Sequence, residues 1–316
     1  MVYSIRHITS FAYEPAIRES VMEVRVQPRN ESRQRCLTFS LDVSPSPNIM
    51  TYRDFLGNTV HHFDIPGRHS QFKITAQALV DVQAAPAPIA AAVGSWADMD
   101  ATVDAGDYSE MLLPSQFAQS TELLQKLVGE LGIERGKNLL QTMLELNHAI
   151  YDGFDYVPNV TQVDSPIDDA LRDRKGVCQD LSHIMIAIVR QLGVPCRYVS
   201  GYLCQKEGAH DRSGDWATHA WLEAFLPGPG WVSFDPTNDL VGGERHIRVA
   251  IGRDYADVPP TRGVYKGDAE SELSVAVMVT PAEAPSPEEI IPTTVIRTRA
   301  PNRGGWEQFQ HEQQQQ

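Results

Sequence analysis

The sequence predicts an α+β protein, in which an all-β antiparallel region precedes a domain of helices packed on a second antiparallel sheet. Three features of the chain support this prediction. The first third alternates apolar and polar residues, two segments with helical spacing follow, and short strands rich in aromatic and β-branched residues come after the second helix. The 316 residues are enough for two ordinary domains and a sizeable core.

The strands of the first third are expected at residues 22–26, 37–43 and 72–80, where apolar side chains occur at every second position. Turn-forming Pro, Gly, Asn and Ser residues separate these runs. Short amphipathic strands with such turns are typical of an antiparallel sheet or sandwich.

Two helices are expected in the second half. The first has Leu139, Met143, Leu146 and Ile150 on one face, at the spacing of a helix that faces a core. The second covers about residues 177–192 and has a continuous apolar stripe. Gly193 ends it, and Pro195 prevents the helix from resuming.

Strands return at residues 197–203, 219–226 and 231–235, and the Pro-Gly-Pro-Gly segment between the last two is a turn. Residues 84–94, AAPAPIAAAVG, have the composition of a linker. The sequence thus divides into an antiparallel β domain (1–90), a linker (91–115), a mixed core (116–270), a segment with C-terminal strands and many Pro and Glu residues (271–300), and a Gln-rich tail expected to be disordered (301–316).

Composition limits the partners. The formal net charge is −14 and the pI is about 5.1, which argues against nucleic acid or an anionic membrane as a partner. We expect a cytoplasmic protein, because the chain has no apolar run of membrane-spanning length and its start lacks the pattern of a signal peptide. The four cysteines form no CxxC pair and do not suggest a disulfide framework.

Cys178 is the candidate nucleophile. It lies in the first turn of the predicted second helix, where unpaired backbone N–H groups and the helix dipole favour an anion. Both effects favour the thiolate, the form that attacks carbonyl carbons. Considered alone, Cys178 is equally well explained as a small buried apolar residue.

The candidate partners of this thiol are His219 and Asp235. His219 begins one predicted strand and Asp235 ends the next, so a hairpin between them brings the start of the first strand near the end of the second. A nucleophilic thiol needs a base, and the base needs a group that orients it. The register of the hairpin does not follow from the sequence, so the contact is a hypothesis.

The segment GVCQDLSHIMIAIVRQLGVPCRYVSGYL and the later THAWLEAFLPGPGWVSFDPTN resemble the bacterial branch of the transglutaminase-like superfamily. The resemblance covers about residues 151–267 and includes cysteine, histidine and aspartate in the order of that family. The N-terminal β region resembles the domain that precedes the core in such proteins. This likeness implies a papain-like α+β core with Cys178 as nucleophile, His219 as base and Asp235 as its orienting group.

The resemblance implies a cysteine-dependent enzyme that transfers acyl groups from amides through a thioester, with hydrolysis of a peptide or other amide favoured. The alternatives are transamidation of protein glutamine, with an amine as acyl acceptor, and a non-catalytic module that binds peptides. We expect no cofactor and no metal, and nothing resembles a calcium-binding EF-hand loop. A zinc site of Cys178, His183 and His219 is a rival, although their spacing follows no familiar ligand pattern.

Secondary residues of the site are less determined. The backbone N–H of Cys178 is the expected first donor to an oxyanion, and Tyr151, Tyr156 or Asn159 is the candidate second donor. Asp180 is expected to point away from Cys178 and to stabilise the helix end or to anchor the site through Arg197 or Tyr202. His183 is expected at the surface or in packing.

Overall fold

The structure is a computed structural model. It describes residues 1–31, 33–84, 93–106, 108–136, 138–206, 208, 211–213 and 217–283. Met1–Ala284 forms one compact unit. The predicted tail at 301–316, the Pro/Glu-rich residues from 284 onward and most of the predicted linker at 84–94 lie outside the described residues.

The N-terminal sheet is antiparallel, and its centre is a pair of long strands, β1 (Val2–Val24) and β4 (Thr59–Val82). On the other side of β4 lie β2 (Gln34–Ser44) and β3 (Met50–Arg53). Buried residues recur at alternate positions along much of β1, because one face of the sheet packs on a core. The strands expected at 37–43 and 72–80 lie within β2 and β4, and the one expected at 22–26 overlaps the end of β1.

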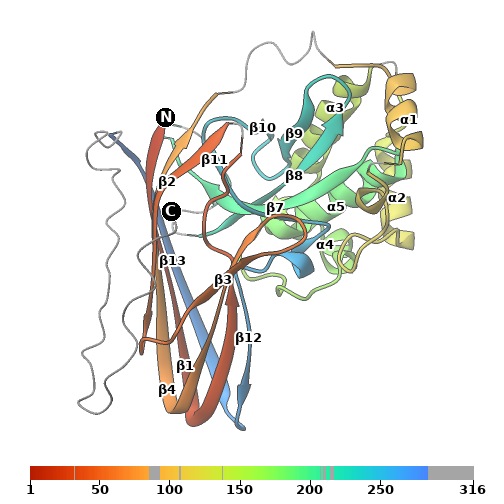
Figure 1. Ribbon diagram of the computed structural model, residues 1–316. Helices are drawn as coiled ribbons and strands as arrows, with labels where there is room; N and C mark the ends of the chain where they lie inside the picture. Colours follow the sequence, from red (N-terminus) through yellow and green to blue (C-terminus); the bar gives the residue numbers. More distant parts are fainter. Residues whose placement is uncertain are drawn as a thin grey trace, which may run out of the picture. The chain divides into compact units, whose positions relative to one another are not determined.

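Two strands from much later in the chain complete this sheet. β12 (Thr261–Lys266) and β13 (Glu270–Ala282) both pair antiparallel with β1, and Figure 1 shows them in blue beside the red β1. The sequence pattern instead divides the chain at residue 270, with the core ending there and 271–300 forming a separate segment. Alternation along a segment predicts a strand, but it does not identify a partner strand at the opposite end of the chain.

Along the sequence, most helices come after the strands β1–β4 and before the core sheet. Among the described residues, no helix is long and apolar enough to cross a membrane. Two short elements fall in the region 91–115 that was expected to be a linker. Ser95 caps the first of them with a capping box, and Met99 of that helix is buried. The helical segments are α1 (Trp96–Asp104), η2 (Ser109–Met111), α2 (Glu122–Leu131), α3 (Leu139–Gly153), α4 (Ile167–Asp173), α5 (Cys178–Gln191) and η3 (Tyr255–Asp257).

The core sheet has five antiparallel strands in the order β10-β9-β8-β7-β11. They are β7 (Cys196–Leu203), β8 (His219–Leu226), β9 (Gly230–Asp235), β10 (Leu240–Val241) and β11 (His246–Gly252). A separate parallel pair, β5 (Asp155–Tyr156) and β6 (Lys175–Gly176), lies just before α5. The α+β fold class predicted from the sequence is therefore confirmed.

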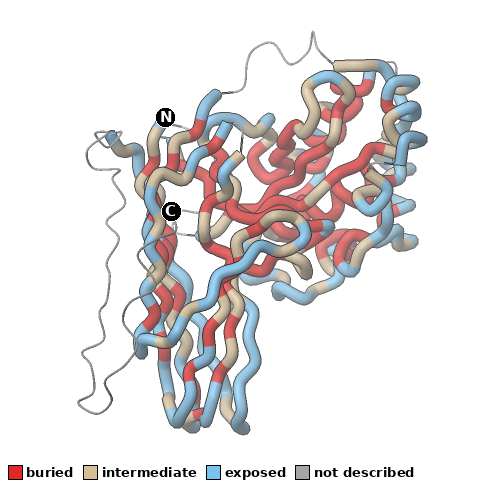
Figure 2. The backbone as a smooth tube through the Cα atoms, in the orientation of Figure 1, coloured by how far each residue is buried: buried red, intermediate tan, exposed pale blue. Residues whose placement is uncertain are grey.

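Helix α5 is the most buried helix, and it holds the core together. Its apolar residues pack in one cluster with side chains of β7 and β8, among them Ile184, Ile188 and Leu222. Figure 2 shows the buried backbone concentrated in α5 and the strands beside it. Each such side chain contributes about 1.5–3 kcal/mol when it is fully buried. Gly193, with φ of 77°, follows the helix, as the sequence predicted.

The two sheets are joined by apolar packing. Tyr3, Ile5 and Val80 from the N-terminal sheet form one cluster with Tyr202 and Ile247 from the core sheet. The strands that contribute these residues are β1, β4, β7 and β11. The N-terminal sheet therefore shares a hydrophobic cluster with the core instead of being a separate unit.

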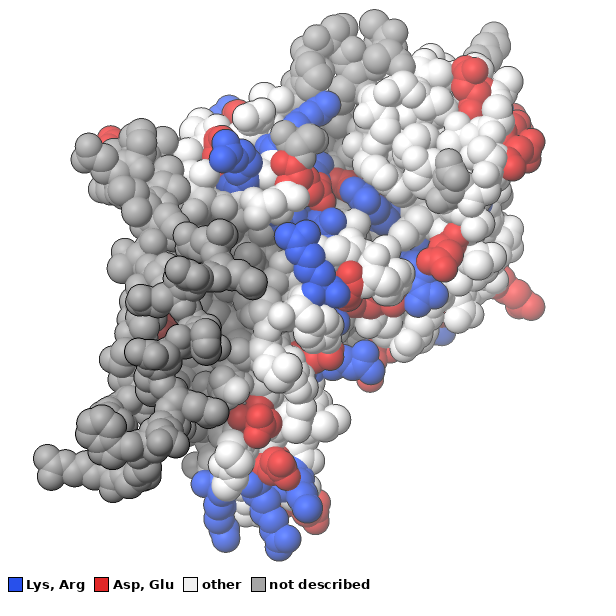
Figure 3. Space-filling view, viewed as in Figure 1, with Lys and Arg blue, Asp and Glu red and all other residues white. Residues whose placement is uncertain are grey.

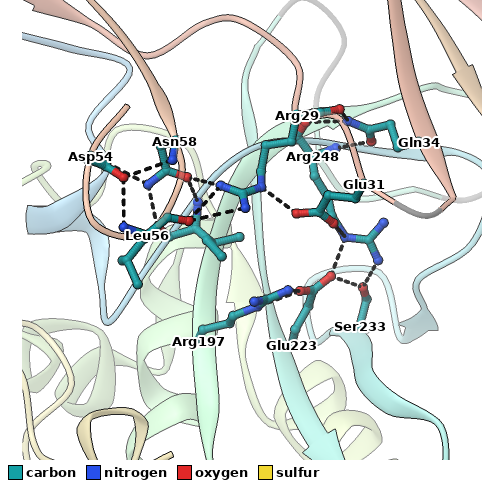
Figure 4. A network of polar contacts seen from close by, with 11 residues as sticks. Arg29, Glu31, Gln34, Asp54, Leu56, Asn58, Arg197, Glu223, Ser233 and Arg248 are labelled. Carbon is teal, nitrogen blue, oxygen red and sulfur yellow. Dashed lines mark hydrogen bonds and ion pairs between the residues drawn. The ribbon is translucent and has the colours of Figure 1, made fainter. Parts of the chain in front are cut away.

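Side-chain amides from the N-terminal region cover the free edge of β11 (Figure 4). Gln34 donates to the carbonyl of Arg248 (2.7 Å) and accepts from its N–H (2.8 Å). Asn58 bonds Ile251 in the same way, with both distances 2.8 Å. An edge strand otherwise leaves such groups unpaired, so the two amides act as a substitute for a neighbouring strand.

A buried carboxylate adds a charged link at the same place (Figure 4). Glu223 in the middle of β8 is fully buried and pairs with Arg197 of β7 and Arg248 of β11. Burial alone would raise the pKa of Glu223, but the two guanidinium groups lower it to about 2. Glu223 is therefore ionised, and its ion pairs tie β8 to its neighbour β7 and to β11 on the far side of β7.

The charge on the face shown in Figure 3 is of both signs. Lys and Arg lie among Asp and Glu across the middle of this face, and a smaller basic group lies at the lower end of the long sheet. Arg18, Arg68 and Lys266 line a shallow hollow of about 280 Å³ in the N-terminal sheet.

The amide cover on β11 predicts a specific loss of stability. We expect Asn58→Ala to lower the free energy of unfolding by about 2–4 kcal/mol, because it leaves the buried N–H and C=O of Ile251 without partners. Urea denaturation followed by circular dichroism measures this. Asn48→Ala, at an exposed position, is the control and should change it by less than about 0.5 kcal/mol. Equal stability of the two variants would refute the role given to Asn58.

Candidate active site

Cys178 is the first residue of α5 and is half-buried. The residue before it, Val177, has an extended backbone (φ −113°, ψ 179°), so the chain turns into the helix at the cysteine. The first N–H groups of a helix have no partner within it. The thiol thus lies beside backbone N–H groups that can stabilise a negative charge, as the sequence pattern predicts.

Asp180 stabilises this helix end. Its Oδ2 accepts hydrogen bonds from the backbone N–H of Val177 (2.8 Å) and the hydroxyl of Thr161 (2.7 Å). A Cβ on Gly176 would lie 2.9 Å from the Asp180 side chain, which explains the glycine there. The partners considered from the sequence are engaged elsewhere, because Arg197 pairs with Glu223 and Tyr202 with His7. The spacing of residues along a helix does not show which side chains from other elements Asp180 contacts.

His219 and Asp235 are in contact. The hairpin of β8 and β9 pairs Leu222 with Phe234 and Leu226 with Gly230, which places Asp235 diagonally across from His219. Asp235 Oδ2 accepts a hydrogen bond from His219 Nε2 at 2.7 Å. Both side chains are almost completely buried. The structure thus supplies the register that the sequence left open.

The charges of this pair support each other. Burial by itself raises the pKa of Asp235 and lowers that of His219. The attraction between the two groups outweighs burial, so the pKa of Asp235 falls and that of His219 rises well above its usual value. The pair is therefore a carboxylate and an imidazolium near neutral pH.

The second nitrogen of His219 is the one available to Cys178. Nδ1 is buried and makes no hydrogen bond of ordinary geometry with a described residue. The Cys178 sulfur nevertheless lies close enough to raise the pKa of His219. Because Asp235 occupies Nε2, Nδ1 is the ring nitrogen left to interact with that sulfur, which gives the order carboxylate, imidazole, sulfur.

Two further residues hold Asp235, and the sequence analysis missed both roles. Asn238 Nδ2 donates to Asp235 Oδ2 (2.9 Å), and its Oδ1 accepts from the N–H of Arg212 (2.7 Å). His246 Nε2 lies 3.2 Å from the same carboxylate oxygen. The available signals were the DPTN segment, in which Asn238 follows Asp235 by three residues, and a histidine that begins a strand.

The three candidates for a second oxyanion donor lie in different surroundings. Tyr156 pairs with Gly176 across β5 and β6, so its backbone runs beside the segment that leads into Cys178. Tyr151 stacks under the guanidinium of Arg212 at 3.5 Å. Asn159 is exposed and has a left-handed backbone with φ of 62°. Its backbone pairing with that segment favours Tyr156 among the three candidates.

His183 is buried and not at the surface. Its Nε2 accepts from the N–H of Tyr255 (3.2 Å), and its ring stacks on Phe117. Burial, together with the charge of Arg190, lowers the pKa of His183 to about 3. His183 thus has a packing role, the second of the two places expected for it.

Metal ligands were also considered. Among the described residues, His219, Asp235 and His246 are the group whose ligand atoms all lie within 4.8 Å of one another. The rival set of Cys178, His183 and His219 does not form such a group there. Hydrogen bonds already join the three buried residues, and a metal ion would have to displace the protons between them.

Comparisons with known proteins agree with the geometry. The family described as Bacterial transglutaminase-like N-terminal region matches residues 3–81, and the Transglutaminase-like superfamily matches residues 129–236. An uncharacterised protein of Mycobacterium leprae is 31% identical over 277 residues, 87% of this chain and 96% of that protein. One of Mycobacterium tuberculosis is 33% identical over 293 residues, 89% of this chain and 93% of that protein.

Two further comparisons concern proteins with a functional name. A crystal structure from Cytophaga hutchinsonii, provisionally named a cysteine protease, has a TM-score of 0.69 and 24% identity, and covers 90% of this chain and 92% of that one. A protein-glutamine gamma-glutamyltransferase of Pseudomonas aeruginosa is 32% identical over 122 residues, 35% of this chain and 18% of that protein. With the relatives that match along nearly their whole length, these findings show that the chain belongs to the transglutaminase-like superfamily.

Proposed function

We propose that the protein is a cysteine-dependent enzyme that transfers the acyl group of an amide through a thioester, and that water is its usual acceptor. The observation that carries this proposal is the chain from Asp235 through His219 to Cys178. The nucleophile lies at a helix start, the base lies beside it, and a buried carboxylate orients the base.

The first half of the reaction forms the thioester. Cys178 Sγ, whose proton is already held by His219 Nδ1, attacks the amide carbonyl carbon as a thiolate to give a tetrahedral oxyanion. The N–H groups at the start of α5 stabilise that oxyanion. The C–N bond then breaks, and the proton on His219 passes to the leaving amine.

The second half releases the acyl group. Water attacks the thioester carbonyl while His219 Nδ1 accepts its proton, and the C–S bond breaks. His219 keeps this proton, which restores the thiolate and imidazolium, and a carboxylic acid leaves. If an amine attacks in place of water, the product is a new amide, so the same residues serve hydrolysis and transamidation.

Hydrolysis is the preferred form, in keeping with the provisional name of the Cytophaga protein. Transamidation of protein glutamine is the second candidate, and the likeness of part of the chain to the Pseudomonas enzyme favours it. A non-catalytic module that binds peptides is the third. We further propose a peptide or protein amide as substrate and a cytoplasmic location, which cell fractionation with an antibody would test.

The first prediction concerns the reactivity of Cys178. We expect iodoacetamide to alkylate Cys178 at pH 6 at least about tenfold faster than the other three cysteines, because an imidazolium stabilises its thiolate. Burial raises the pKa of Cys36 and Cys196 to about 11 and also raises that of Cys204. Peptide mass spectrometry measures each rate. His219→Ala should remove the advantage, and a slow Cys178 in the wild type would favour the binding module.

The second prediction concerns turnover and the acyl acceptor. In a peptide library we expect the acid product to predominate even with an added alkyl amine, and Cys178→Ala to lower turnover by about 1,000-fold or more. Liquid chromatography with mass spectrometry identifies the products. Cys36→Ala, which removes a thiol from β2, is the control and should keep turnover. Predominant amide product would establish transamidation, and full turnover by Cys178→Ala would refute the mechanism.

The third prediction concerns pH. The lowered pKa of Asp235 stabilises the fold above about pH 4, and the raised pKa of His219 stabilises it fully below about pH 6.5. The loss of stability in Asp235→Asn should therefore be largest between about pH 4 and 6.5 and should shrink as pH rises through the folded-state pKa of His219.

Urea unfolding of the wild type and of Asp235→Asn at several pH values measures that loss. Asp42→Asn, an exposed change on β2, is the control and should lose little at any pH. A loss of stability for Asp235→Asn that stays constant from about pH 5 to about pH 9 would contradict the ion pair.

A further inference from the structure

His246 lies behind the proposed catalytic residues, and its protonation state follows from its hydrogen bonds. It begins β11, pairs with Leu203 of β7, and is buried. The backbone N–H of Gly243 donates to His246 Nδ1 (3.3 Å). Because a backbone N–H can only donate, Nδ1 is an acceptor, and the proton of the neutral ring is on Nε2.

That proton points to the Asp235 carboxylate. His246 Nε2 lies 3.2 Å from Asp235 Oδ2. Burial lowers the pKa of His246, and the charges of His219 and Arg245 lower it further against the opposite effect of Asp235. The ring is therefore neutral at physiological pH and donates one hydrogen bond to the carboxylate.

Packing fixes the ring in this place. The ring of Trp221 meets His246 edge-on at 5.1 Å and stacks on His219 at 5.8 Å. A Cβ on Gly201 would lie 2.6 Å from Trp221 and 2.2 Å from the carbonyl of Ile247. The glycine thus gives room for the indole between the two imidazoles, and neither ring can turn freely.

The carboxylate of Asp235 has its acceptor positions filled. Oδ2 receives His219, His246 and Asn238, and Oδ1 receives the backbone N–H groups of Thr237 and Asn238. A carboxylate offers about four lone-pair positions, so a set of donors this large holds it in one orientation. With Asp235 fixed as an acceptor, His219 Nε2 must carry its proton and present Nδ1 to the thiol.

We propose that His246 is a positioning residue for the reaction, which keeps Asp235 oriented so that His219 holds its reactive nitrogen toward Cys178. This inference rests on the proposed function, because it concerns the same thiol. His246 acts through Asp235, which it contacts, and through His219, which Asp235 orients.

Two substitutions separate support of the carboxylate from support of the turn. In His246→Gln the amide N–H₂ takes about the place of Nε2 and can still donate to Asp235. In His246→Asn the shorter amide takes about the place of Nδ1, so it can accept from Gly243 but does not reach Asp235. His246→Leu removes both bonds.

The experiment measures two quantities for each variant. One is the rate at which iodoacetamide alkylates Cys178 between about pH 5 and about pH 9, a range that includes the usual pKa of histidine. The other is the thermal unfolding midpoint. We expect His246→Asn and His246→Leu to react about tenfold more slowly at pH 6, since one hydrogen bond to a charged group is lost. Their reaction should become fast only at higher pH. His246→Gln should restore most of the rate.

The outcomes are distinct. A wild-type Cys178 without enhanced reactivity refutes the proposed function, and this inference with it. An activated wild type with unchanged Asn and Leu variants refutes only the role of His246. Equal losses in all three variants, together with equal falls in the unfolding midpoint, would give His246 a purely structural role and would overturn positioning.

Discussion

The buried negative charge of Asp235 is the constraint on which the site depends. A carboxylate removed from water is tolerated only when it is paired and fully hydrogen-bonded. Its donors come from β8, β11 and the turn after β9, so parts of the chain that are distant in sequence must meet at one side chain. Asn238 extends this group to residues 212 and 213 through its carbonyl oxygen. The fold of the core sheet and the alignment of the proposed base are thus one requirement.

Strand β8 carries a second buried ionised group, and it links the N-terminal sheet to the site. Glu223 holds Arg248 of β11, while Gln34 and Asn58 from the N-terminal region pair with the outer edge of the same strand. β11 begins at His246, which touches Asp235. Through these bonds to β11, the N-terminal region supports the position of His246. These contacts give the sheet the role of a scaffold for β11.

The sequence predicted the fold class and the proximity of His219 and Asp235, because helical and strand periodicities are local and a short hairpin has few ways to fold. Of the two roles it offered for Asp180, stabilising the helix end is confirmed by the bond from the Val177 N–H, whereas the bond with the Thr161 hydroxyl was not predicted. Nor did it place β12 and β13 on β1, since alternation does not name the neighbouring strand. His246 was missed for the same reason, because its contact with Asp235 depends on how β11 pairs with β7.

The direction of proton transfer in the proposed reaction depends on the carboxylate of Asp235, which can only accept hydrogen bonds. An ionised carboxylate has no proton to give, so Asp235 makes every neighbour a donor, including His219 Nε2. In the proposed reaction the remaining nitrogen of His219 is the one that exchanges a proton, as thiol, amine and water succeed one another at the same place. The imidazolium that forms meanwhile is stabilised by a charge that does not move. A buried carboxylate held by several donors thus serves both halves of the proposed reaction without taking up a proton itself.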